Sequence, residues 1–180
     1  FLRAYAYFTL YRYYGGVPLI IEPTGPKPDY VPRATRQEMF KFLYDEMAYA
    51  LDKCLDNRSG IAYGRVTKGA VAGMLAKMKI FHASYIRRAE MYGNKINETT
   101  ADDVDKTTLY ADAVKLCDDI IAGVYGTYKL EEYFPAVFTK RNNEIMFSVL
   151  AEEGVGTGNK IPMGFAGEGK YGATGGRNLT

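Results

Sequence analysis

Three segments of this chain repeat apolar side chains at helical spacing, and they constrain its fold more than any other feature. Within residues 36–55, 67–85 and 108–122 such side chains recur at steps of three and four. The repeating residues are Phe40, Leu43, Met47, Leu51 and Cys54, then Val71, Met74, Leu75, Met78, His82 and Tyr85, and finally Tyr110, Ala113, Val114, Cys117 and Ile121. The pattern predicts three amphipathic helices, each with one buried stripe.

Boundary signals flank these helices. Thr35 with Glu38 forms a capping box, Thr67 can cap the second helix, and Gly123 can end the third. The first two helices should pack as an antiparallel hairpin. Small residues in the second helix would let a neighbouring helix approach closely: Gly69, Ala70, Ala72, Gly73 and Ala76. Such hairpins predict a mostly α, tetratricopeptide-like array, although the polar insert at 94–107 interrupts any regular repeat.

The remaining segments predict one more helix, long loops and a little β structure. Residues 1–14 are helical in character and so rich in aromatic side chains that we expect the helix to be buried nearly all round. Prolines crowd residues 18–32 and predict an extended surface loop. A short helical turn is expected around 131–138, and the alternation in 144–150 is typical of a strand.

Composition excludes several classes of protein. The 23 Lys and Arg residues nearly balance the 21 Asp and Glu residues without a basic run, which argues against nucleic acid as the main partner. No apolar run approaches the roughly 18 residues of a membrane span. The chain starts without Met inside a predicted helix, which is typical of a fragment or a processed product. Cys54 and Cys117 are expected as buried thiols, although a cross-link between packed helices stays open.

Three blocks, in this order and spacing, resemble the SusD/RagB family of outer-membrane nutrient-binding lipoproteins. They are Phe1–Phe8 with Gly16–Leu19, Gly64–Ala70, and Asn143–Ser148. The resemblance implies the central segment of a helical protein that docks on a SusC-like TonB-dependent transporter at the cell surface. It also implies capture of an oligosaccharide, or in some relatives a peptide, without catalysis and without a cofactor. A lipid anchor would then lie upstream of this segment.

The glycine-rich residues 151–180 are the candidate ligand-facing region, whereas residues 1–150 are expected to form the helical scaffold. Sugar binding requires flat rings that stack on pyranose faces and polar groups that hold hydroxyls. This segment offers both, in Asn159, Phe165, Tyr171, Arg177 and Asn178. The alternative is that its rings only anchor a loop onto the scaffold. The rings at helical spacing in residues 1–14 are assigned to the core instead, namely Tyr5, Tyr7, Phe8, Tyr11, Tyr13 and Tyr14.

Other chemistry is disfavoured by the residue pattern. His82 has no second histidine or cysteine nearby and lies on an apolar face, so we expect a core imidazole and no metal site. Asp102, Asp103 and Asp105 are expected to be solvated or to cap a helix. Adjacent carboxylates such as Glu131 and Glu132 seldom face each other across a glycosidase cleft. A helical scaffold that binds only proteins, and a hydrolase, remain as alternative functions.

Overall fold

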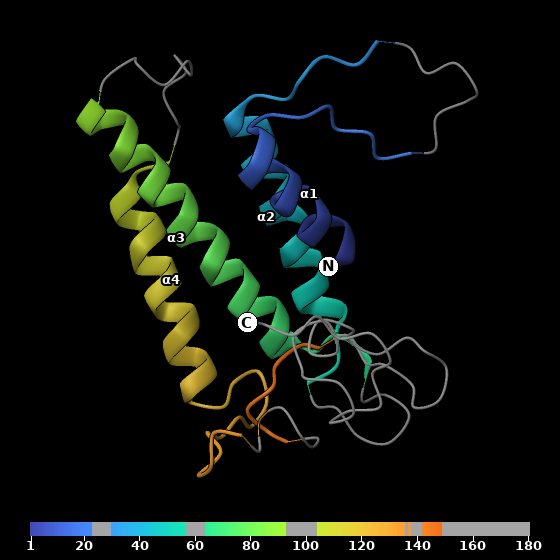
Figure 1. Cartoon of the computed structure of the whole chain (residues 1–180), viewed down its shortest axis with the longest axis vertical. Helices are drawn as coiled ribbons and strands as arrows, with labels where there is room; N and C mark the ends of the chain where they lie inside the picture. The colour runs from blue at the N-terminus through green and yellow to red at the C-terminus, as the bar shows by residue number, and fades with distance from the viewer. Residues whose placement is uncertain (23–29, 57–63, 93–103, 136, 138–141, 149–180) are drawn as a thin grey trace, which may run out of the picture. The chain divides into compact units, whose positions relative to one another are not determined.

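The computed structural model describes residues 1–22, 30–56, 64–92, 104–135, 137 and 142–148. These residues form four helices, which are α1 (Leu2–Tyr14), α2 (Arg36–Lys53), α3 (Lys68–Tyr92) and α4 (Lys106–Ile121) (Figure 1). The chain divides into two compact units, 1–147 and 148–180, and all four helices belong to the first. None of them has the length and apolar content needed to cross a membrane. The prediction of a mostly α, helical-repeat fold is confirmed.

The predicted caps define where the helices begin. At α2 the Glu38 amide donates to Thr35 Oγ1 (3.2 Å) and the Thr35 amide donates to Glu38 Oε2 (2.8 Å), which completes the capping box. The hydrogen bond from the Thr35 backbone lowers the pKa of Glu38, because it stabilises the carboxylate. At α3 the Ala70 amide donates to Thr67 Oγ1 (3.3 Å). Asp105 caps α4 by accepting from the amide of Thr107 (3.0 Å).

Gly123 ends α4 as predicted, in a left-handed conformation with φ +80°. Its amide donates to the Ile120 carbonyl (3.1 Å), and the Val124 amide donates to the Asp119 carbonyl (2.9 Å). These two bonds form a Schellman motif, which requires a positive φ that glycine adopts without steric cost.

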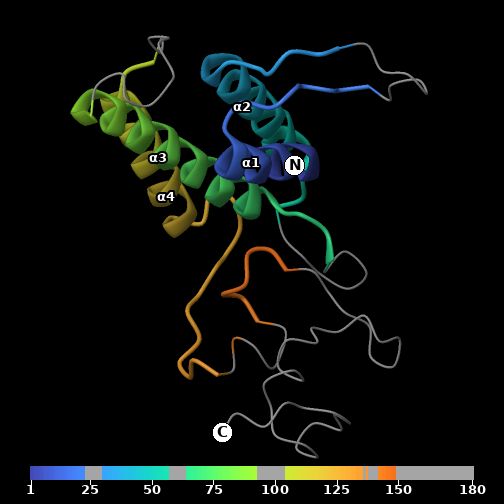
Figure 2. The same cartoon turned by 45° about the horizontal axis from the view of Figure 1, so that its top comes forward.

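Helices α2 and α3 form the predicted antiparallel hairpin. Leu55, just after α2, makes an isolated parallel bridge with Thr67, just before α3. Further along, the Tyr44 hydroxyl lies 2.9 Å from His82 Nδ1, so the contacts move back along α2 as they move forward along α3. Helix α4 runs beside α3 in both views, again with the opposite direction (Figures 1 and 2).

Polar contacts join α3 to α4 at three levels. Lys79 Nζ lies 2.8 Å from Asp112 Oδ2, the Ser84 and Tyr110 hydroxyls are 3.2 Å apart, and Lys106 pairs with Glu90. Helix α3 therefore contacts α2 on one side and α4 on the other, and it is the central element of the helical unit.

The core lies where α1, α2 and α3 meet. Its largest side chains are Phe8 and Tyr11 of α1, Met39, Phe40, Leu43 and Met47 of α2, and Val71, Leu75 and Met78 of α3. The rings meet edge to face, with centroids 5.1 Å apart for Tyr11 and Phe40 and 5.5 Å apart for Phe8 and Phe81. Full burial of one such side chain contributes about 1.5–3 kcal/mol. Side chains at helical spacing in the first two predicted stripes therefore hold the helices together.

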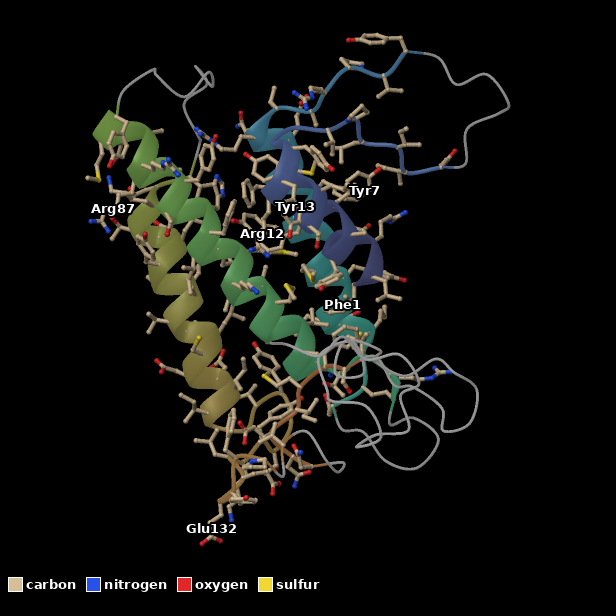
Figure 3. The ribbon with its side chains drawn as sticks, in the orientation of Figure 1. Phe1, Tyr7, Arg12, Tyr13, Arg87 and Glu132 are labelled. Carbon is tan, nitrogen blue, oxygen red and sulfur yellow. The ribbon has the colours of Figure 1, made fainter. Side chains whose placement is uncertain are left out.

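The prediction that the opening helix is buried nearly all round is wrong. Within α1 only Ala4, Phe8 and Tyr11 are buried, while Tyr13 is 77% exposed and Tyr14 is also exposed. Figure 3 labels Tyr13 among the side chains of this helix. The reason is geometric: α2 and α3 both meet α1 on the side that carries Phe8 and Tyr11, so the opposite side of the helix stays exposed. The aromatic content of a helix does not reveal on how many sides neighbouring elements cover it.

The buried stripe predicted for the last helix is also displaced. Leu109, Ala113 and Leu116 are the buried residues of α4, whereas Val114 and Cys117 are exposed and Ile121 is 84% exposed. Both stripes have helical spacing, so periodicity could not choose between them; contact with α3 does. The expectation of a buried Cys117 is therefore wrong. Cys54 is half-buried against the core, and both thiols are free.

Residues 144–148 do not form the predicted strand. The amides of Glu144 and Ile145 both donate to Asn142 Oδ1, at 3.0 and 3.1 Å, which is a side-chain-capped turn. The alternation reflects packing instead, since the Phe147 ring meets Phe1 at 5.2 Å. Just before this segment, the Val137 amide donates to the Phe134 carbonyl (3.1 Å), consistent with a short helical turn.

The small residues of α3 accommodate side chains from the segment that follows α4. A Cβ on Gly69 would lie 2.1 Å from the Tyr128 hydroxyl, and one on Gly73 would lie 3.4 Å from the methyl of Met146. The prediction of a close approach was correct at these positions, but the partner at both glycines is a loop side chain. Ala72 and Ala76 belong to the core.

Candidate functional site

The five residues predicted to bind ligand lie outside the described residues: Asn159, Phe165, Tyr171, Arg177 and Asn178. Their role stays a prediction. The part of the chain that the structure describes offers a different candidate, a pocket of about 240 Å³ between α2 and α3.

The pocket follows one side of α2. Its lining residues are Gln37, Phe40, Lys41, Tyr44 and Asp45 of α2, His82 of α3, and Val104 just before α4. The α2 residues recur at helical spacing, so the helix places them on one side by itself. His82 and Val104 join them only because α3 and the start of α4 pack nearby. Pockets for drug-sized ligands measure about 300–1,000 Å³, so this pocket accommodates one small ring or one side chain.

Stacked rings form the floor of this pocket. The rings of His82 and Phe40 are parallel, with centroids 3.8 Å apart and 2° between their planes. His82 is 2% exposed, and its Nδ1 lies within hydrogen-bond distance of the Tyr44 hydroxyl. The expectation of a buried core imidazole is therefore confirmed. Tyr44 Oη is held in place by this contact, which fixes the ring at the edge of the pocket.

Charged groups surround the ring of Tyr44. Lys79 Nζ lies 4.8 Å from its centroid, and the same ammonium pairs with Asp112. On the outer rim Lys41 Nζ and Asp45 Oδ2 are 2.7 Å apart in an exposed i,i+4 ion pair. Such a pair contributes only about 0.3–0.5 kcal/mol to stability, so both side chains can exchange their mutual contact for a ligand.

The arrangement suits binding better than chemistry. An aromatic floor with an amide, an ammonium and a carboxylate at its rim can hold a polar ring through stacking and hydrogen bonds. Among the described residues, no group of three or more His, Cys, Asp or Glu side chains is placed to hold a metal ion.

Sequence reasoning missed this pocket although part of its signal was visible. Phe40 was counted in the buried stripe, and Tyr44 lies four residues further on the same side of the helix. A tyrosine next to an apolar stripe, flanked by Lys41 and Asp45, marks the boundary between core and solvent, where pocket residues are found. Val104 gave no such signal, because only the packing of α4 brings it there.

Comparison with known proteins supports the resemblance. Residues 1–80 match a SusD-like sequence family described as "Starch-binding associating with outer membrane". No curated protein matches the chain. The structure is similar to a crystal structure of a SusD-like protein from Bacteroides fragilis NCTC 9343, with a TM-score of 0.58 and 22% identity over 81% of this chain. The match covers 25% of that protein, so this chain spans a quarter of its length. The resemblance to the SusD/RagB family is thus confirmed, by a family match over residues 1–80 and by a shared helical fold.

Proposed function

We propose that this chain is the helical scaffold, with the beginning of the ligand-facing region, of a cell-surface protein that captures oligosaccharides. The observation that carries the proposal is the match of residues 1–80 to a family described as starch-binding and associated with the outer membrane. The capture step is binding without bond cleavage. The captured glycan passes to a SusC-like TonB-dependent transporter, and a lipid anchor upstream of this segment holds the protein at the outer membrane.

The scaffold role agrees with how the helical unit is built. Helix α3 is fixed to α2 by core packing and to α4 by three polar contacts. A site held by packed elements loses little conformational entropy when it binds, which favours affinity. Two places in the chain offer sugar-binding chemistry, namely residues 151–180 with their five predicted contacts and the pocket beside Tyr44.

Calorimetric titration with malto-oligosaccharides tests the proposal, because the matching family is described as starch-binding. We expect saturable heat from the unmodified protein. Tyr171→Ala should weaken binding by about 2- to 10-fold, the loss of one stacking contact, while leaving the melting temperature unchanged. Tyr133→Ala is the matched control, since Tyr133 is an exposed tyrosine that does not line the described pocket. Absence of heat with every glycan tried would refute the proposal.

A second pair of variants asks whether the pocket contributes. Lys41→Ala removes a rim ammonium, and Lys53→Ala removes an exposed, ion-paired lysine of the same helix outside the pocket. Weaker glycan binding by Lys41→Ala alone assigns a sugar contact to the pocket. Equal affinities leave residues 151–180 as the remaining candidate.

The alternatives are separated by the same measurements. A peptide-binding relative gives heat with peptides and none with glycans, whereas a scaffold for proteins gives heat with neither. Release of shortened sugars during the titration identifies a hydrolase.

A further inference from the structure

Helix α1 carries an exposed side without any charged group. Leu2, Ala6, Thr9, Leu10 and Tyr13 lie on the side of α1 opposite its buried residues, and we call them the outer face of α1. Leu2 is 65% exposed and Tyr13 is 77% exposed. The exposed side of a helix in a soluble protein normally carries charged and polar residues.

The polar groups of α1 are directed away from this face. Arg3 pairs with Glu46 of α2 through its Nε (3.0 Å), and the Arg12 guanidinium lies over the Phe8 ring, 5.8 Å from its centroid. The Thr9 hydroxyl donates to the carbonyl of Tyr5 within the same helix (2.9 Å). The helix itself therefore satisfies the Thr9 hydroxyl, and the Tyr13 hydroxyl is the main polar group of the outer face.

The exposed side of α2 is built in the opposite way. There Lys41 pairs with Asp45 and Lys53 pairs with Asp52, and the exposed Tyr49 lies among them. Solvated helix surfaces normally look like this, with charges around isolated rings. Two helices of one unit thus differ sharply on their exposed sides, and the difference marks α1 as a contact surface.

We propose that the outer face of α1 is an internal packing surface, covered by a further segment of a longer polypeptide of which these 180 residues are one part. The length comparison selects this occupant, because three quarters of the matched SusD-like chain has no counterpart here. The covering segment presents apolar side chains and no unpaired charge, since a charge buried against this face would lack a partner. The proposal is independent of the ligand that the protein binds.

Thiol labelling of the intact polypeptide tests this proposal. Cys54→Ala and Cys117→Ser first remove the native thiols, and then Tyr13→Cys is compared with the matched control Tyr49→Cys. In the intact monomer we expect the cysteine at position 13 to react at least about tenfold more slowly than the one at position 49, because it reacts only when the covering segment opens. In the isolated 180 residues both should react equally fast.

Three results would overturn the proposal. The first is fast labelling of position 13 in the intact monomer. The second is protection that depends on protein concentration and accompanies a dimer, since a second copy would then cover the face. The third is a gene that encodes only these 180 residues.

A second variant keeps the test decisive if a cysteine variant fails to fold. Ala6→Glu places one charge in the middle of the outer face without removing a core side chain. It should lower the melting temperature of the intact polypeptide and leave that of the isolated 180 residues unchanged. Equal melting temperatures of the intact polypeptide with and without Ala6→Glu would contradict an internal packing surface.

Discussion

Replacing Gly69 by alanine should destabilise this protein, although alanine is the better helix former. A Cβ at Gly69 would lie 2.1 Å from Tyr128 Oη and 2.4 Å from its Cε2, which is well inside van der Waals contact. The ring cannot stay in place, so its hydrogen bond to Thr67 Oγ1 (2.9 Å) is lost as well. Thr67 is buried, and its hydroxyl also caps α3.

The magnitude follows from three contributions to the free energy of unfolding. Overpacking costs about 1–3 kcal/mol. The lost hydrogen bond costs about 0.5–1.5 kcal/mol. The helix propensity of alanine offsets up to about 1 kcal/mol of this. We therefore expect Gly69→Ala to lower the unfolding free energy by about 0.5–4.5 kcal/mol.

Gly73 provides the matched control in the same helix. A Cβ there would lie 3.4 Å from the Met146 methyl, an ordinary contact, so Gly73→Ala should gain up to about 1 kcal/mol from helix propensity. Urea denaturation followed by circular dichroism measures both variants. The two substitutions should change the midpoint in opposite directions.

The role of Tyr128 is tested by a double-mutant cycle. In a Tyr128→Ala background the clash is absent, and Gly69→Ala should become neutral or stabilising. If Gly69→Ala is equally destabilising with and without Tyr128, the ring is not the cause and the reasoning fails.

Three smaller experiments address other contacts. Tyr44→Phe should cost about 1–3 kcal/mol in urea denaturation, because buried His82 loses its partner at Nδ1; an unchanged midpoint would show that this hydrogen bond contributes nothing. Glu38→Gln should make the unfolding free energy depend less on pH in the acidic range. The pKa of Glu38 is lowered in the folded state, so its carboxylate stabilises the fold above the unfolded pKa of about 4.3. That contribution disappears as the pH falls through the lower folded pKa. Equal profiles of unfolding free energy against pH for the native protein and Glu38→Gln would argue against this coupling. Cys117→Ser should leave the melting temperature unchanged because the thiol is exposed, and a clear decrease would contradict that exposure.

Local signals predicted the helices and most of their ends, although α3 extends to Tyr92, beyond the predicted Tyr85. The capping box at Thr35 and Glu38, the cap at Thr67 and the left-handed Gly123 all depend on residues within one turn of each other. Such interactions form within the helix itself and need no neighbour. For the same reason the antiparallel hairpin was predictable, since short connections join helices that pack side by side.

The predictions that failed all required knowledge of a neighbour. Two apolar stripes compete on α4, and only contact with α3 buries Leu109 and Leu116 while leaving Ile121 in solvent. The alternation around Phe147 is typical of a strand, yet Asn142 turns the backbone and the side chains pack without a paired strand in the described part of the chain. The pocket depends on Val104, which joins Tyr44 only through packing.

The amino-acid sequence by itself determined that this chain is helical, where most of its helices begin and end, and which family it resembles, because caps, periodicity and motif spacing act over a few residues. Tertiary structure alone decided which side of each helix is buried, that α1 has an exposed uncharged face, and that α2 and α3 enclose a pocket. Burial depends on which surfaces meet, and helices with several apolar sides leave that choice to their neighbours.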